Sequence, residues 1–389
     1  MAPTTPGRWR LRLLILSHVV DDFYQGAVPA LVPFFVAERH YGYVAAAGIT
    51  LAATLLSSVV QPLFGILTDR RPMPWLVPAG LTVAGVGIGL SGLSESYLWT
   101  WLAIALSGVG VAAYHPEAAR LARSASAGSH VGMSWFSLGG NIGFALGPII
   151  VAPVMTAVGL GGSPLLFIPA ALVGLLLAVL LRHLGPPAVS ATAAGRAALV
   201  DRWGQFARLT SVVILRSVAT FSLHTFLALW VAQRLDASGQ LAGQAALVLL
   251  FTAGAAGTLL GGLLAGRLGR VRTVRWACLL TIPVLAGVAL VPGPAVYVFV
   301  VAAGLGLNVP FSLHMTLGQD YLPSRIGTAS GVTLGLAMSI GGLVAPLVGL
   351  IAEAVGLQAA ILTLVLAPLA SWVIALGMEE PVQVVGSVK

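Results

Sequence analysis

The stretch SHVVDDFYQGAVPALVPFF, residues 17–35, places two adjacent aspartates inside a run that is otherwise suited to a lipid bilayer. An aspartate at the centre of a membrane span costs about 2.5–3.5 kcal/mol on insertion. With a rise of about 1.5 Å per residue, Asp22 would lie roughly 16 Å inside a helix that begins near Leu11. A carboxylate at that depth has to be protonated, hydrated in a cavity or paired with a cation. The stretch therefore predicts a helix that lines a polar site within a membrane.

The rest of the chain has the same apolar character. Its 389 residues are 58% hydrophobic and 8% charged, and the mean hydropathy is +0.97. Apolar runs of roughly 18–25 residues recur along it, each long enough to cross a hydrocarbon core of about 30 Å as a helix. Because the runs are continuously apolar, they favour helices over the alternating strands of a β-barrel. We expect twelve transmembrane helices, at 11–36, 44–67, 75–93, 97–120, 131–156, 163–182, 208–233, 242–266, 273–291, 294–317, 326–352 and 357–377.

The positive charges lie beside these spans. The net charge is +8, but the arginines occupy short loops instead of a basic domain, so no nucleic-acid partner is expected. If the spans alternate in direction, most arginines fall on one side, and the opposite loops hold only Arg39 and Arg234. The positive-inside rule then places both termini in the cytoplasm of a bacterial cell, with the chain in the cytoplasmic membrane. The single cysteine, Cys278, falls inside a span, and neither a metal nor a cofactor is expected.

The chain divides into two similar halves. A polar linker at 183–207 separates a bundle at 1–182 from a bundle at 208–389. Three short matches recur about 195 residues apart: VAER at 36–39 with VAQR at 231–234, GILTDR at 65–70 with GLLAGR at 262–267, and GVG at 108–110 with GLG at 304–306. Two six-helix halves of the same orientation are the parallel repeat of major facilitator transporters. We therefore expect an all-α integral membrane protein with twelve transmembrane helices in two six-helix pseudo-repeats.

Two motifs resemble signatures of the major facilitator superfamily. Residues 65–71, GILTDRR, resemble its G-x-L-x-D-R loop, although prolines at 72 and 74 replace part of the usual basic end. The resemblance assigns gating roles to Gly65, Asp69 and Arg70. Residues 143–148, GFALGP, resemble the G-x-x-x-G-P core of an antiporter motif, in which small residues allow close helix contact and proline bends the helix. Gly143, Gly147 and Pro148 are therefore also expected to take part in gating, although packing alone explains the glycines nearly as well.

A narrower resemblance comes from three further stretches. GVGVAAYHPEAAR at 108–120, DDFYQGAVPALVPF at 21–34 and QPLFG at 61–65 closely resemble the fosmidomycin-resistance family of bacterial efflux proteins. The resemblance is strongest through the first five spans. It implies a proton-driven exporter whose namesake cargo, fosmidomycin, is a small phosphonate antibiotic. Span four has Ile104 where classical drug antiporters carry a membrane arginine, so their proton relay does not transfer directly.

The helical spacing of the first span arranges its polar residues. His18, Asp22 and Gln25 share one face, and Asp21 turns toward the side of Ser17 and Tyr24. The obvious partner in span seven is Arg216, the one arginine expected deep in the membrane. We hypothesise that Arg216 binds an anionic cargo or pairs with Asp21 or Asp22, and that protonation of a carboxylate frees it. The alternative is a static ion pair that only fixes helix packing.

The remaining candidates follow from polarity and from the family stretches. His115, beside a proline in span four, has chemistry that suits proton exchange, and it joins Asp21 and Asp22 as a proton-coupling candidate. Glu117 is expected to pair with Arg120 or Arg123, and His314 is a loose counterpart of His115. The expected substrate-binding residues are Arg216, His18, Tyr24, Gln25, His224, Asn141 and Asn308.

These observations predict a proton-coupled secondary transporter, most simply an exporter that exchanges protons for small anionic, phosphonate-like compounds. Uptake of a metabolite by proton symport is the alternative within transport. A polytopic membrane enzyme is a remote alternative, because the chain has no H-E-x-x-H, G-x-S-x-G or Walker motif. The expected partners are a small-molecule substrate, protons and the lipid bilayer, and we expect a monomer.

Overall fold

A computed structural model describes residues 5–126, 130–180, 200–235, 239–325, 328, 329, 332, 333 and 337–381. The described residues form helices and connecting turns, with no strand among them. The first group comprises α1 (Thr5–Arg39), α2 (Tyr43–Arg70), α3 (Leu76–Leu90), α4 (Tyr97–Ala125), α5 (His130–Val158), η1 (Leu160–Phe167) and α6 (Ile168–Leu180). The second comprises α7 (Trp203–Arg234), α8 (Gly239–Leu268), α9 (Arg270–Leu290), η3 (Gly293–Ala295), α10 (Val296–Asn308), α11 (Phe311–Tyr321), α13 (Ala337–Val355), α14 (Leu357–Thr363) and α15 (Leu366–Leu376).

These helices are consistent with the twelve expected spans. Within the described ranges, nine are long and apolar enough to cross a membrane, and two shorter apolar helices lie at Leu76–Leu90 and Ser339–Val355. The tenth expected span, 294–317, is broken into α10 and α11, because Pro310 cannot donate a backbone hydrogen bond. Much of the expected linker 183–207 and part of the expected span 326–352 lie outside the described residues.

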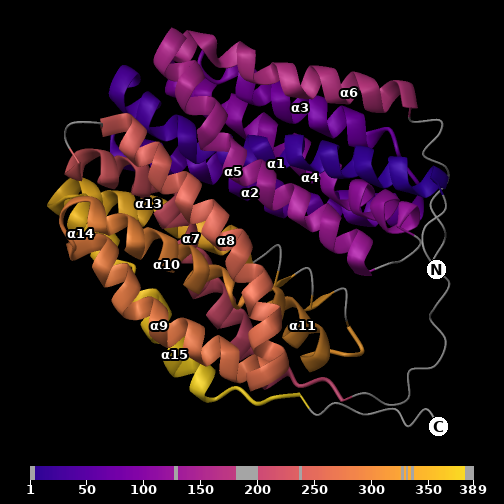
Figure 1. Ribbon diagram of the computed structural model, residues 1–389, viewed down its shortest axis with the longest axis vertical. Helices are drawn as coiled ribbons and strands as arrows, with labels where there is room; N and C mark the ends of the chain where they lie inside the picture. Colours follow the sequence, from indigo (N-terminus) through magenta and orange to yellow (C-terminus); the bar gives the residue numbers. More distant parts are fainter. Residues whose placement is uncertain are drawn as a thin grey trace.

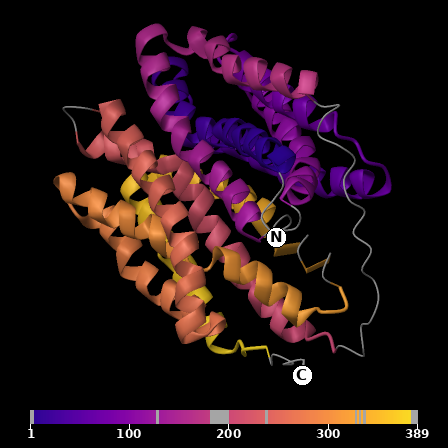
Figure 2. The ribbon, with the colours of Figure 1, turned by 45° about the vertical axis from the view of Figure 1, so that its right-hand side comes forward.

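The helices form two groups that lie side by side (Figure 1). Helices α1–α6, coloured indigo to magenta, make one half, and helices α7–α15, coloured rose to yellow, make the other. We call the end of the bundle where α1 begins and α15 finishes the termini end. The opposite end, where α1 finishes at Arg39, is the far end. Seen from another side, the same two groups are again distinct (Figure 2).

Matching contacts recur in the two halves. Arg39, at the last turn of α1, donates a hydrogen bond to the carbonyl of Gly92, just beyond α3. Arg234, at the last turn of α7, donates to the carbonyls of Leu290 and Val291, at the end of α9. In each half, therefore, an arginine at the end of one helix binds backbone oxygens that the end of another helix leaves unsatisfied.

Two glycines of the sequence repeat also make matching contacts. A Cβ added at Gly108 would lie 2.5 Å from the carbonyl oxygen of Ala53 on α2. A Cβ added at Gly304 would lie 2.5 Å from the carbonyl oxygen of Leu250 on α8. Both glycines let neighbouring backbones approach closely, and the sequence echo therefore has a structural counterpart.

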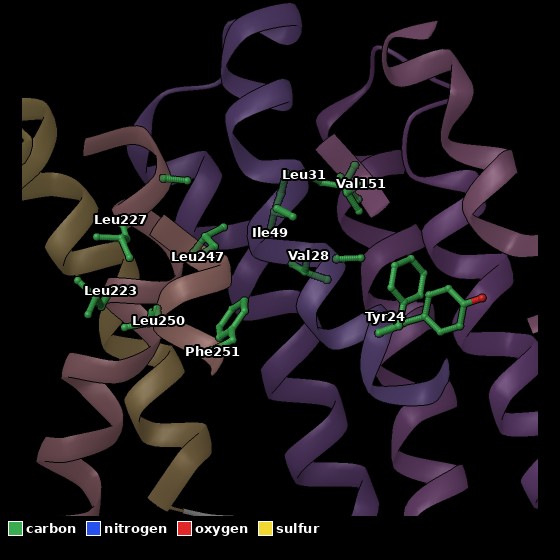
Figure 3. Close-up of a cluster of buried hydrophobic side chains, with 14 of the residues drawn as sticks. Tyr24, Val28, Leu31, Ile49, Val151, Leu223, Leu227, Leu247, Leu250 and Phe251 are labelled. Carbon is green, nitrogen blue, oxygen red and sulfur yellow. The ribbon is translucent and has the colours of Figure 1, made fainter. Parts of the chain in front are cut away.

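The two halves touch each other through α2, α5, α8 and α13, among others. At the far end, the amide of Val44 donates to the Glu353 carboxylate across 3.0 Å, and the side chain of Gln244 donates to the carbonyl of Ala30. Deeper in the bundle, apolar side chains of both halves meet, including Val28 and Ile49 from the first half and Leu223 and Phe251 from the second (Figure 3). Toward the termini end the two groups of helices spread apart (Figures 1 and 2).

Candidate functional site

The polar residues of α1 meet a histidine of α4 inside the first half. The two oxygens of the Asp22 carboxylate face two imidazoles, at 3.3 Å from His18 Nε2 and 3.3 Å from His115 Nε2. Gln25 donates its amide to Asp22 across 2.5 Å. Asp22 is 6% exposed and His18 is 7% exposed, so the contacts form away from bulk solvent. The expected face of His18, Asp22 and Gln25 is thus present.

The other nitrogens of both imidazoles face backbone carbonyls. His18 Nδ1 lies 2.7 Å from the carbonyl oxygen of Phe136 on α5, and His115 Nδ1 lies 2.9 Å from that of Val111 on α4. A carbonyl oxygen only accepts hydrogen bonds, so each Nδ1 has to carry a proton. Each Nε2 is consequently the nitrogen that faces the Asp22 carboxylate. The backbone thereby fixes both rings with their Nε2 atoms aimed at one carboxylate.

Asp21 has a different environment from its neighbour. It is fully buried, and neither carboxylate oxygen forms a hydrogen bond within the described residues. Its Oδ2 lies 3.5 Å from His115 Nδ1, so the His115 ring stands between the two carboxylates. The His115 side chain is 21% exposed and is the least buried member of this group. We call His18, Asp21, Asp22 and His115 the acid–imidazole cluster.

Glycines of α5 bring that helix against the cluster. A Cβ added at Gly140 would lie 2.3 Å from Asp22 Oδ2 and 2.8 Å from His18 Cε1. At Gly143 it would meet the carbonyl of Val19 at 2.3 Å, and at Gly147 it would meet the backbone of Gly26 at the same distance. The GFALGP glycines therefore pack α5 on α1 within one half, which agrees with the packing explanation and leaves their gating role a prediction.

Three side chains of the acid–imidazole cluster are close enough to hold a divalent cation. His18, Asp22 and His115 each offer a ligand atom, and these atoms all lie within 4.8 Å of one another. The 3.3 Å contacts between nitrogen and oxygen are already those of ion pairs without a metal. This group has no metal-binding spacing along the chain, because the packing of α4 on α1 is what brings His115 to His18.

The expected ion pair between Arg216 and the aspartates is not formed in this conformation. The guanidinium of Arg216 instead donates to the carbonyl of Leu307 across 3.0 Å and lies 5.3 Å from the ring centre of Phe311. The pairing hypothesis is wrong for this conformation because α4 packs beside α1 in the same half, and its histidine supplies the partner that α7 was expected to supply.

Arg216 is nevertheless a buried cation without an acidic partner in the described part of the chain. It is 8% exposed, and its Nε forms no hydrogen bond there. It lines a small cavity of about 20 Å³ together with Cys278 and Ser371. Such a volume holds about one water molecule or small ion. The site is therefore cationic and nearly closed in this conformation.

A second small cavity lies between the halves. It measures about 40 Å³ and is lined by Gln25 and Phe144 of the first half and by Phe221 and His224 of the second. Gln25 joins this cavity to the cluster, because its amide is bound to Asp22. His224 is thus at the cavity, as expected, with its ring edge-on to Phe251 at 4.9 Å.

Three other expected binding residues, Tyr24, Asn141 and Asn308, are not among the residues that line these two cavities. The Tyr24 hydroxyl donates to the carbonyl of Leu166 and accepts from the amide of Ala170, so the side chain is directed into the first half. Figure 3 shows the Tyr24 ring pointing away from Phe251 and the second half. Asn308 donates to the carbonyl of Gly304 in its own helix, and Asn141 is half-buried on α5. Tyr24 is therefore not among the residues that line the two small cavities in this conformation, and its role in substrate binding stays a prediction.

The expected gating loop is only partly described. The side chains of Asp69 and Arg70 lie outside the described residues. Among the described residues, a Cβ added at Gly65 would have no neighbour within 4 Å, and the same holds for its counterpart Gly262. No described residue therefore packs against Gly65 in this conformation, in which the two halves spread apart at the termini end (Figure 1), and the gating role of Gly65 stays a prediction.

Three features of the site were not predicted from the sequence. They are the Phe136 carbonyl that fixes His18, the fit of Gly140 against Asp22, and the hydrogen bond of 2.6 Å between Ser17 and Tyr114. The run of glycines at 139–143 could have indicated the close approach of α5 to α1.

Glu117 pairs with Arg120 as expected, although the Glu117 side chain is fully buried.

Two apolar helical halves with buried ionisable groups near their middle define a polytopic membrane transporter. The family model described as "Major Facilitator Superfamily" matches residues 13–346. The fosmidomycin resistance protein of Escherichia coli (strain K12) is 31% identical over 358 residues, which cover 88% of this chain and 87% of that protein. The chain therefore belongs to the Major Facilitator Superfamily and, within it, to the family of the fosmidomycin resistance protein.

Two further comparisons agree with this assignment. An uncharacterized MFS-type transporter of Bacillus subtilis (strain 168), YfnC, is 30% identical over 349 residues, covering 86% of this chain and 84% of that one. The crystal structure of a bacterial homolog of the human lysosomal transporter Spinster, in an inward-facing and unoccupied conformation, superposes with a TM-score of 0.81. It covers 96% of each chain at 16% identity, so this likeness concerns the fold alone.

Proposed function

We propose that this protein is a proton-coupled exporter of small anionic compounds, in which the acid–imidazole cluster carries the proton and Arg216 holds the anion. The bundles at 1–182 and 208–389 are the two halves that rock against each other during transport, and both termini lie in the cytoplasm. With that orientation the termini end faces the cytoplasm, and the conformation is open inward.

The placement of the His115 ring between two carboxylates carries the proton part of the proposal. Asp22 receives the Gln25 amide and faces two imidazoles, whereas Asp21 has no hydrogen bond among the described residues. A buried carboxylate without donors is costly, so Asp21 is the group that favours a bound proton in this conformation. The 21% exposure of His115 gives the ring access from outside the cluster. A change in that access during rocking would let the proton enter on one side and leave on the other.

The unpaired guanidinium supports the anionic cargo. Arg216 is buried beside a small cavity, and its Nε has no hydrogen-bond partner among the described residues. Arginine binds carboxylate and phosphate oxygens through its planar set of donors, and a phosphonate presents the same kind of oxygens. The name of the Escherichia coli relative concerns resistance to a phosphonate antibiotic, which agrees with this chemistry. The fold and the family support export and uptake equally, so the direction rests on that relative.

The test uses the full chain in inside-out membrane vesicles, with fosmidomycin as the probe. An imposed gradient that makes the vesicle lumen acidic should drive accumulation of the probe, and a proton uncoupler should abolish it. His115→Gln should remove this gradient-driven accumulation while the protein remains folded in the membrane. EDTA should leave transport unchanged, because the cluster acts through protons and needs no metal. Accumulation driven by an alkaline lumen would support symport and overturn the proposed direction, and loss of transport with EDTA would favour a metal at the cluster.

A further inference from the structure

The second half carries an apolar groove that is separate from the central cavity. The groove lies between α8, α9 and α10 and has a volume of about 320 Å³. Its lining includes Leu264, Trp276, Leu280, Ala302 and Leu305. Pockets of roughly 300–1,000 Å³ hold small organic ligands, so the groove has room for more than water. Because Trp276 is 50% exposed and Leu280 is 59% exposed, the groove opens on the outer surface of the bundle.

The groove reaches the termini end of the membrane span. Leu268, which lines it, is the last residue of α8, and Thr273, which also lines it, lies in the first turn of α9. The groove walls belong to helices that are apolar enough to cross a membrane. Its opening therefore faces hydrocarbon, and Trp276 lies toward the end where indole rings commonly meet the lipid headgroups.

Two arginines stand at this end of the groove. Arg267 follows Leu264 by three residues on α8, and Arg272 precedes Trp276 by four residues on α9, so each shares a helix face with a lining residue. Both side chains are exposed, and no hydrogen bond or ion pair of either is found in the described part of the chain.

Their neighbours in sequence behave differently. Arg270 binds Asp320 at 2.7 Å and Glu380 at 3.2 Å, and Arg275 donates to the carbonyls of Ala375 and Met378. The protein thus satisfies Arg270 and Arg275 internally, whereas Arg267 and Arg272 have no such partner among the residues that the structure describes.

We propose that one anionic phospholipid binds here, with an acyl chain in the groove and its phosphate between Arg267 and Arg272. Basic pockets at the ends of membrane helices attract anionic headgroups, and guanidinium donors match phosphate oxygens. A zwitterionic lipid offers the same phosphate together with its own cation, so it should compete poorly for two arginines. The site does not depend on the proposed cargo or on proton coupling.

The test is native mass spectrometry of the full-length protein released from nanodiscs that contain equal amounts of phosphatidylglycerol and phosphatidylcholine. The wild-type protein should retain one phosphatidylglycerol. The double variant R267Q/R272Q should lower that retention by roughly tenfold or more. The matched control is Arg123→Gln, since Arg123 is an exposed arginine in the last turn of α4, at the same end of the other half. It should retain the lipid as the wild type does.

A second pair of variants tests the groove itself. Ala302→Phe fills it and leaves both arginines in place, and Leu280→Gln makes one exposed wall polar without adding bulk. Each should lower phosphatidylglycerol retention, with near-native thermal unfolding of the detergent-solubilised protein as the check on folding. Loss in the arginine variant alone would mean attraction to surface charge, and loss in the groove variants alone would mean an uncharged hydrophobic ligand. Either result, or equal retention of the two lipids by the wild type, overturns the proposal.

Discussion

The two halves place opposite charges at matching positions of one scaffold. Asp21 on α1 and Arg216 on α7 are about 195 residues apart, which is also the spacing of the matching arginines Arg39 and Arg234. His115 and Phe311 are separated by nearly the same number of residues, so by this spacing Phe311 is the counterpart of His115, and not His314 as expected. In the first half the imidazole lies against carboxylates, and in the second half the aromatic ring lies under the guanidinium.

The two halves share backbone contacts and differ in their central side chains. The backbone contacts at Gly108 and Gly304 are alike, and so are the hydrogen bonds that Arg39 and Arg234 make. Side chains at the centre of each half differ completely in charge. A duplicated scaffold therefore holds acidic and imidazole groups in one half and a guanidinium in the other, and the proposed function assigns the proton to the first and the anion to the second.

The largest effect on this difference between the halves is expected from removing Asp22, the acid that both imidazoles face. Asp22→Asn should abolish gradient-driven transport, because it leaves two buried imidazoles without their anion, and losing one partner of a buried pair costs about 3–5 kcal/mol. Proton-driven flux in proteoliposomes measures the effect. Asp21→Asn is the matched control: it imitates the protonated acid and should retain cargo exchange that no longer responds to a pH gradient. Exchange and gradient response both intact in Asp22→Asn would contradict the role of the cluster.

The complementary change removes the cation of the second half. Arg216→Gln should raise the KM for an anionic cargo by roughly 10- to 100-fold, since a hydrogen bond to a charged group contributes about 1.5–3 kcal/mol. The measurement is initial uptake at a series of fosmidomycin concentrations. Arg216→Lys retains the charge without the planar set of donors, so its KM should fall between those of the wild type and Arg216→Gln. An unchanged KM in Arg216→Gln would place the anion elsewhere.

A third change disturbs the geometry of the cluster and leaves its charges intact. Gly140→Ala puts a methyl group within 2.3 Å of Asp22 Oδ2, and overpacking of this kind costs about 1–3 kcal/mol. Proton-coupled flux should fall, while the KM for cargo should change less than in Arg216→Gln. Gly262→Ala is the control, because a Cβ there has no neighbour within 4 Å among the described residues. Equal flux in both alanine variants would show that the fit of α5 on α1 is not needed.

The smallest expected effect concerns the contact between the halves at the far end. Glu353 accepts a hydrogen bond from Val44 at the start of α2, and loss of such a helix cap costs about 1 kcal/mol. Glu353→Ala should therefore shift the balance of open and closed far ends by roughly fivefold. Spin labels at positions 93 and 290, in a Cys278→Ser background, would report the distance between the halves. Glu353→Gln, which retains an acceptor, should shift it less, and an unchanged distance distribution in Glu353→Ala would exclude the contact as a latch.

Much of the architecture followed from the sequence because bilayer thickness sets the length of an apolar helix. The expected spans coincide closely with α1–α9, and the face of His18, Asp22 and Gln25 follows from helical periodicity alone. The break at Pro310 was not predicted, since proline both interrupts some helices and is tolerated inside others, as Pro116 is in α4. The contacts of Tyr24 with Leu166 and Ala170 were not predicted, because helical periodicity gives the side of a helix and does not tell which neighbour lies on that side.

The sequence by itself determined a polytopic helical transporter with a duplicated fold and ionisable groups at membrane depth, because composition, run length and repeat spacing are local or periodic properties. Only the tertiary structure decided the partners of those groups. His115 is more than ninety residues from Asp22 along the chain, and it reaches the carboxylate because α4 packs on α1. Arg216, equally plausible by depth, is held by its own half. Contact between distant side chains depends on how helices pack, and the order of residues along each helix does not specify that packing.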